Sequence, residues 1–182
     1  MRVRIRRSRF PVALAALAVL LAAAPALPQV TLSIVPVSGQ FQCGETWAVD
    51  VMVDALAGDL RGSSLVVQYD NNVIRPLSVA AGALVTGAAC PHFAWWFGPA
   101  DADSVAFDVA TLGCSVAGPG AIARITFEGH AGGTTAISLR RADLRTGTNA
   151  PIPYTALGAQ VQYDCPVADR RETWGSLKAR YR

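Results

Sequence analysis

The 182-residue sequence lacks the short motifs that accompany common catalytic and nucleotide-binding sites. It contains no G-x-S-x-G nucleophile elbow, no phosphate-binding P-loop, no G-x-G-x-x-G and no H-E-x-x-H. Histidine is scarce, because the chain has only His92 and His130, and these offer little general-base capacity. These absences argue against an enzyme.

Acidic pairs and metal-ligand patterns add little to this picture. Asp101 lies near Asp103 and Asp50 near Asp54, but nothing in the sequence places either pair across a cleft, as glycosidase chemistry requires. The sequence has no C-x-x-C pair, which argues against a structural zinc site. The stretch "DADS" from 101 to 104 has too few oxygen ligands for a dedicated calcium loop. We therefore expect no metal and no cofactor.

The N-terminal segment has the three parts of a secretory signal peptide. "MRVRIRRSRF" carries five arginines and no acid, and the apolar run "PVALAALAVLLAAAPA" follows it and ends in small residues. That run is too short for a transmembrane anchor, which needs about 20 residues. Residues 1–26 are therefore predicted to be a signal peptide, and the mature protein is predicted to be extracellular or part of the cell envelope.

Charge is distributed unevenly along the mature chain. The formal charge of +3 becomes −2 without the leader, so the basic isoelectric point gives no reason to expect a nucleic-acid partner. Residues 28–164 carry six arginines against eleven acids, whereas the tail, residues 165–182, carries five basic residues against two acids. Trp174, Leu177 and Tyr181 would line one side of a short helix in that tail. The tail could dock on a partner, lie on an anionic membrane surface or stay mobile.

Short β-type runs punctuated by Gly, Pro, Asn and Asp fill residues 28–164, with no long helical pattern and no repeat. This pattern predicts one all-β domain of about nine strands, arranged as a two-sheet antiparallel sandwich. The expected strands cover 30–36, 46–55, 62–69, 73–79, 92–98, 104–113, 121–129, 134–144 and 154–164.

Two of these runs make more specific predictions. In "TWAVDVMVDA" the alternation puts Trp47, Val49, Val51 and Val53 on one face, which we expect to be the core face. The runs 62–69 and 73–79 are predicted to form a hairpin. The Asp-Asn-Asn sequence between them tolerates the left-handed positions of a tight turn.

All four cysteines lie in the exported part, which suggests two disulfides in one of three connectivities. Pairing 92–98 with 104–113 around "PADAD" sets Phe97 against Phe107, Trp95 against Val109 and Cys90 against Cys114. A Cys90–Cys114 bridge would close the open end of that hairpin. Cys43–Cys165 then follows by elimination.

The same register divides the aromatic cluster "HFAWWFG" between two faces. Trp95 and Phe97 share the core face with Val105, Phe107 and Val109, while Trp96 is left on the outer face near Asp108 and Ala106. An outward tryptophan on a sheet of small residues would stack on a sugar ring or anchor a protein partner. The alternative is that a loop or the tail covers it.

The order of these segments resembles a bacterial cohesin domain and related carbohydrate-binding sandwiches. The resemblance rests on "WAVDVMVDA", on "YDNNVI" followed by "V…G", on "GAIARITF" followed by a glycine turn, and on the late "L…D" step. It covers about Val30 to Tyr163 and implies a non-catalytic jelly-roll sandwich of about nine strands with adjacent termini.

The resemblance also implies how such a domain works. Cohesins bind dockerin modules through one sheet face, and the strands carried over to that face hold Leu65, Val67, Tyr69, Trp96, Ala106 and Asp108. The leading hypothesis is a secreted binding module for a dockerin-like or other extracellular protein. A carbohydrate-binding module for extracellular polysaccharide and a structural component of the cell envelope are the alternatives.

Overall fold

The computed structural model describes residues 29–101, 103–165 and Lys178. The predicted leader, and the predicted tail apart from Cys165 and Lys178, lie outside these residues. No helix in the described part of the chain is long and apolar enough to cross a membrane.

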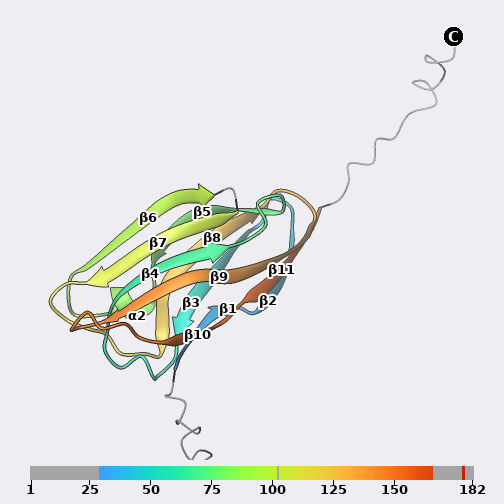
Figure 1. Ribbon diagram of the computed structural model, residues 1–182. Helices are drawn as coiled ribbons and strands as arrows, with labels where there is room; N and C mark the ends of the chain where they lie inside the picture. The colour runs from blue at the N-terminus through green and yellow to red at the C-terminus, as the bar shows by residue number, and fades with distance from the viewer. Residues whose placement is uncertain (1–28, 102, 166–177, 179–182) are drawn as a thin grey trace, which may run out of the picture.

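The described chain folds into two β-sheets packed face to face (Figure 1). The five-stranded sheet has the order β10 (Tyr154–Leu157), β1 (Val30–Val35), β3 (Thr46–Val53), β8 (Gly120–Gly129), β5 (Ile74–Ala81). The six-stranded sheet has the order β2 (Ser38–Gln42), β11 (Ala159–Asp164), β9 (Gly133–Thr146), β4 (Leu60–Gln68), β7 (Ser104–Thr111), β6 (His92–Asp101). Neighbours are antiparallel except for β1 with β10 and β2 with β11. The predicted all-β, two-sheet sandwich is confirmed.

The structure has more strands than the predicted set of about nine. β2 was missed because "SGQFQ" contains one large apolar residue, Phe41. The run 154–164 forms two strands, β10 and β11, which belong to different sheets. The chain changes sheets at Gly158, where a Cβ atom would lie 2.8 Å from the carbonyl oxygen of Ile137, so only glycine fits without a shift.

Alternation along the strands places the core as predicted for β3 and β7. Trp47, Val49, Val51 and Val53 are all buried, and so are the inward residues of β7. Each such aliphatic side chain contributes roughly 1.5–3 kcal/mol when fully buried. The core is therefore the layer between the two sheets, and the outer face of each sheet is in contact with solvent.

The predicted hairpin of residues 62–69 and 73–79 is wrong. β4 lies in the six-stranded sheet and β5 in the five-stranded sheet, where Ile74 is opposite Gly129. The turn between them is local: Asn72 N donates to Asp70 Oδ1 at 2.9 Å, and Ile74 N donates to Asp70 O at 3.1 Å. None of its residues has a positive φ; among described non-glycine residues only Asn149 does. The backbone N–H groups of Asn72 and Ile74 find their acceptors within the turn, so it can connect strands of two different sheets as well as the strands of one hairpin.

Both predicted disulfides are present. Cys43–Cys165, the closing bridge, joins residues 122 positions apart, with Cα atoms separated by 4.9 Å. Cys90–Cys114, the strand-end bridge, joins residues 24 positions apart, with Cα atoms separated by 6.4 Å. The closing bridge ties the end of β11 to the loop after β2, far from the first residue of β1. Figure 1 accordingly shows the described chain beginning and ending at opposite ends of the sandwich, which corrects the expectation of adjacent termini.

Candidate binding face

The register between β6 and β7 differs by one residue from the predicted one. Trp95 lies opposite Asp108, not opposite Val109, and Trp96 lies opposite Phe107. Because successive side chains in a strand point to opposite faces, a shift of one residue exchanges the two faces completely. The predicted inward and outward residues of β6 are therefore reversed.

Trp96 points toward the core and not toward solvent. It is half-buried, packs against the buried cluster, and its indole Nε1 is buried with no hydrogen-bond partner. The prediction that Trp96 is the outward aromatic residue is therefore wrong.

Phe93, Trp95 and Phe97 instead form a row on the outer face of β6, which we call the aromatic row. Their exposed fractions are 50%, 53% and 48%. The ring centroids of Phe93 and Trp95 are 6.4 Å apart with parallel planes, and those of Trp95 and Phe97 are 6.3 Å apart. β6 is also an edge strand of its sheet. A continuous row of exposed aromatic side chains on a folded surface is typical of an interaction site.

A flat floor of small side chains adjoins the aromatic row. Asp108 of β7 lies opposite both Trp95 and Ser64, so outward positions on three neighbouring strands share one level of the sheet. The outward positions around Asp108 on β7 and β4, which we call the small-residue floor, are Ala106, Ala110, Gly62, Ser64 and Val66. These side chains are short, so the larger side chains of the aromatic row and of Asp108 project beyond them.

The remaining predicted face residues divide between the two sides of this sheet. Ala106 and Asp108 point outward, as expected. Leu65, Val67 and Tyr69 are 1–3% exposed and face the core, where Tyr69 packs edge-on against Phe127. The strand β4 does contribute to the outer face, as predicted, but through its outward residues. The side chains of Leu65, Val67 and Tyr69 are covered by the core and cannot touch a partner.

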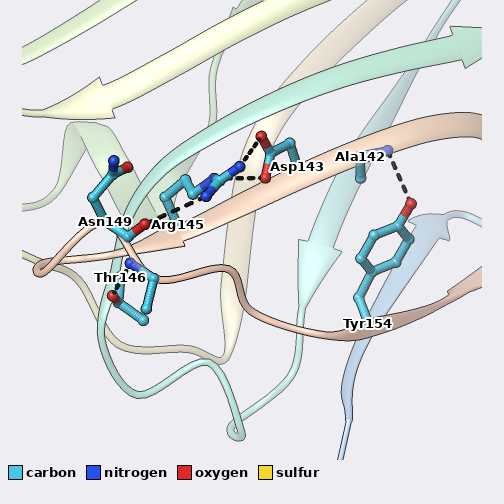
Figure 2. A network of polar contacts seen from close by, with 7 residues as sticks. Ala142, Asp143, Arg145, Thr146, Asn149 and Tyr154 are labelled. Atoms are coloured by element: carbon cyan, nitrogen blue, oxygen red, sulfur yellow. Dashed lines mark hydrogen bonds and ion pairs between the residues drawn. The ribbon is translucent and has the colours of Figure 1, made fainter.

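A polar network at the end of β9, drawn in Figure 2, borders the floor on its other side, because Asp143 lies opposite Ser64 and Arg145 opposite Gly62. Arg145 forms an ion pair with Asp143 at 2.7 Å and donates to the carbonyl oxygen of Asn149 at 3.3 Å. Asn149 has φ of 65° in the turn after β9, where its N–H donates to Thr146 O at 2.9 Å. The guanidinium of Arg145 thus connects the strand to its turn and fixes this border.

The second half of β9 lies beyond the reach of β11, which pairs only with residues 133–137. At this uncovered stretch Ala142 N donates to the hydroxyl of Tyr154 at 3.0 Å (Figure 2). Tyr154 belongs to β10 of the opposite sheet, so it links the two layers while satisfying a backbone donor.

The outer face of the five-stranded sheet has a different character. Arg124 forms a bidentate pair with Asp50, both bonds 2.8 Å long, and Arg75 pairs with Glu128 at 2.6 Å. Side chains of opposite charge therefore satisfy one another on that face. The six-stranded sheet carries the exposed aromatic row.

Two tyrosines in the described part of the chain have a raised pKa, and both lie away from the aromatic row. Burial raises the pKa of Tyr69 and the pKa of Tyr163, and both tyrosines belong to the core. The described residues contain no group of three or more His, Cys, Asp or Glu side chains placed to hold a metal ion. Asp103 of the "DADS" stretch accepts a hydrogen bond from Gln68 at 3.3 Å, while the side chain of Asp101 is outside the described part.

The fold can be compared with those of known proteins. No protein-family model matches the sequence, and no curated protein matches it significantly. Solved structures do match. A type II cohesin domain from the cellulosome of Acetivibrio cellulolyticus aligns with a TM-score of 0.64 at 15% identity, covering 74% of this chain and 95% of that one. A non-cellulosomal cohesin of the archaeon Archaeoglobus fulgidus aligns with a TM-score of 0.63 at 14% identity, and the alignment covers 75% of this chain and 92% of that one. The chain has the cohesin fold.

The OlpC cohesin of Clostridium thermocellum, solved in complex with a dockerin, aligns with a TM-score of 0.62 at 13% identity and covers 79% of this chain and 98% of that one. The likeness thus spans nearly the whole of each cohesin domain. At this level of identity the comparison establishes the fold alone, so the surface of this cohesin-fold chain has to be interpreted from its own side chains.

Sequence reasoning missed the aromatic row although its signal was present. Phe93, Trp95 and Phe97 alternate at the spacing of one strand face, but the predicted register assigns that face to the core. The pattern alone supports either assignment, because the other face of the run carries Trp96, which is equally suited to the core.

Proposed function

We propose that this chain is a secreted, non-catalytic docking module that binds an extracellular protein through the outer face of its six-stranded sheet. The aromatic row carries this proposal, because three aromatic side chains stand about half exposed beside a flat floor. The cohesin fold supports it, since the OlpC cohesin was solved with a dockerin bound. Dockerin-type modules are the first class of partner to test.

Covering the aromatic row would contribute substantially to the free energy of docking. An aromatic side chain buries 150–250 Å² when fully covered, so covering the exposed halves removes roughly 300 Å² from water. At about 25 cal/mol per Å² this contributes about 7.5 kcal/mol, against a cost of association of about 4–15 kcal/mol. Residues of this kind commonly form the energetic centre of an interface, with near-neutral contacts around them. The small-residue floor would let a partner approach the row closely.

Extracellular location is part of the proposal. Two disulfides fit an oxidising compartment, and the predicted signal peptide accounts for export. Contact of the basic tail with an anionic membrane surface stays a prediction from sequence.

The test is an affinity capture with the exported protein as bait. Purified dockerins and the secreted proteins of the source organism would be passed over wild type, Trp95→Ala and Leu77→Ala. Leu77 is the matched control, because it is exposed but lies on β5 of the opposite sheet. We expect a specific protein to be retained by wild type and Leu77→Ala and lost with Trp95→Ala.

Other results of this test would replace the proposal. A protein that Trp95→Ala retains as well as wild type would show that docking uses another surface. Cell-wall polysaccharide retained in place of protein, and released by Trp95→Ala, would make the aromatic row a sugar-stacking platform. Binding to neither class would favour a structural role in the envelope.

A further inference from the structure

Two carboxylates in the described part of the chain have no hydrogen bond or ion pair to another residue: Asp108 and Asp164. On the outer face of the five-stranded sheet, by contrast, Asp50 is paired with Arg124 and Glu128 with Arg75. Asp164 is exposed at the end of β11, whereas Asp108 is half-buried on β7, the strand next to the edge strand β6 of the six-stranded sheet. Asp108 is therefore the exception on the proposed docking face.

Asp108 also lies where a partner would cover it. It is directly opposite Trp95 on one side and Ser64 on the other, and Ala106 and Ala110 flank it along β7 on the same face. Because side chains directly opposite each other on neighbouring strands lie side by side, a protein surface that covers the Trp95 ring also reduces the hydration of this carboxylate. Small neighbours leave it open from above and offer no cation of their own.

Burying an unpaired carboxylate is strongly unfavourable, because the charge loses its hydration and gains nothing in return. A partner that covers Trp95 with an apolar surface alone would bear that cost. We infer that the partner presents an arginine or lysine side chain to the Trp95–Asp108 pair, with apolar residues next to it. The inference rests on the proposed docking function and specifies the chemistry of the partner.

Arginine fits this place better than lysine. A guanidinium stacks on the face of an indole ring and offers two parallel N–H donors to a carboxylate, while the ring and the carboxylate both attract the cation. Lysine would satisfy the charge with a single, less directional contact. The Trp95–Asp108 pair therefore selects for a cation flanked by apolar surface and against an acidic partner segment.

A displayed library of random peptides tests this before the natural partner is identified. Peptides would be selected on the exported wild-type protein, and those that need Trp95 would be identified by loss of binding to Trp95→Ala. We expect these peptides to be enriched in arginine or lysine beside apolar residues. Their dissociation constants should weaken about 10- to 100-fold with Asp108→Asn, as for loss of a charge-assisted hydrogen bond. They should be unchanged with Asp164→Asn, the matched loss of an unpaired carboxylate.

A reversed charge sharpens the test. Asp108→Lys should abolish binding of those peptides and restore it to versions in which the basic residue is replaced by glutamate. Trp95-dependent peptides that show no basic enrichment, or that bind Asp108→Asn as tightly as wild type, would overturn the inference while leaving the docking function intact. If no selected peptide depends on Trp95, the docking face and the inference fail together.

Discussion

Trp96 and Trp95 are neighbours in sequence, and the structure predicts opposite consequences for their removal. Truncating a fully buried aromatic residue to alanine costs about 3–5 kcal/mol. Trp96 is half-buried and packs against the core, so we expect Trp96→Ala to lower the free energy of unfolding by about 2 kcal/mol. Trp95 is 53% exposed and faces solvent, so Trp95→Ala should cost at most about 1 kcal/mol.

The unpaired indole nitrogen of Trp96 refines this prediction. A buried donor without a partner carries a cost of about 1–3 kcal/mol, which a phenyl ring in the same place would not carry. The ring of phenylalanine fills most of the same volume. Trp96→Phe should therefore leave the free energy of unfolding within about 1 kcal/mol of the wild-type value, because the relief offsets the lost packing.

Urea unfolding followed by far-ultraviolet circular dichroism measures all three variants under one condition, with the disulfides intact. Circular dichroism is preferred to fluorescence because each substitution changes the tryptophan signal. An unchanged m-value would confirm that the variants differ in stability and not in the extent of unfolding. If Trp95→Ala proves as destabilising as Trp96→Ala, the register of β6 against β7 is wrong, and with it the aromatic row.

The other predictions concern the bridges, one carboxylate and one glycine. Replacing both cysteines of the closing bridge with serine should lower the free energy of unfolding by about 5 kcal/mol, and the same change in the strand-end bridge by about 3.5 kcal/mol. The difference arises because the two bridges close loops of 122 and 24 residues. Equal losses of stability, measured by thermal unfolding, would contradict the loop-entropy account. The N–H of Thr31 donates to Asp54 and holds the pKa of that carboxyl below its usual 3.8. The stability that this hydrogen bond adds is therefore present above about pH 4 and is lost as the pH falls through the lowered pKa. The difference in stability between wild type and Asp54→Asn should shrink at about pH 3, and a difference that stays constant with pH would contradict this assignment. Gly129→Ala should cost about 1–3 kcal/mol, because its Cβ would overlap the ring of Tyr163, and an unchanged melting temperature would argue against that contact.

Local patterns in the sequence predicted the features that local physics controls. The alternation of Trp47, Val49, Val51 and Val53 identifies the core face of β3, because the other side of that strand carries a charged residue, Asp50. The cysteines were paired correctly although the register used for Cys90 and Cys114 was off by one residue. That bridge lies beyond the last paired residues, His92 and Thr111, and there a shift of one residue still leaves the sulfur atoms within reach.

The register of β6 was not available from sequence. Both faces of 92–98 carry aromatic side chains, so hydrophobic alternation does not choose between them. The pairing of β6 with β7 is also irregular between Phe97 and Asp101, where β6 has extra residues. Counting paired residues outward from the turn therefore gives the wrong register. Only the packing of Trp96 against the core selects the face and leaves the other aromatic side chains outside.

By itself, then, the sequence determined the class of fold, the two bridges and the buried face of each strand whose two sides differ in polarity. The class of fold and the buried faces follow from the side-chain period, which acts over a few residues, and the bridges follow from the small number of cysteines. The tertiary structure alone decided that β4 and β5 belong to different sheets and that Trp95, not Trp96, stands beside Asp108. Both outcomes depend on contacts between segments far apart in the chain, such as Ile74 with Gly129, and the free energy of such contacts is set by the packed core as a whole.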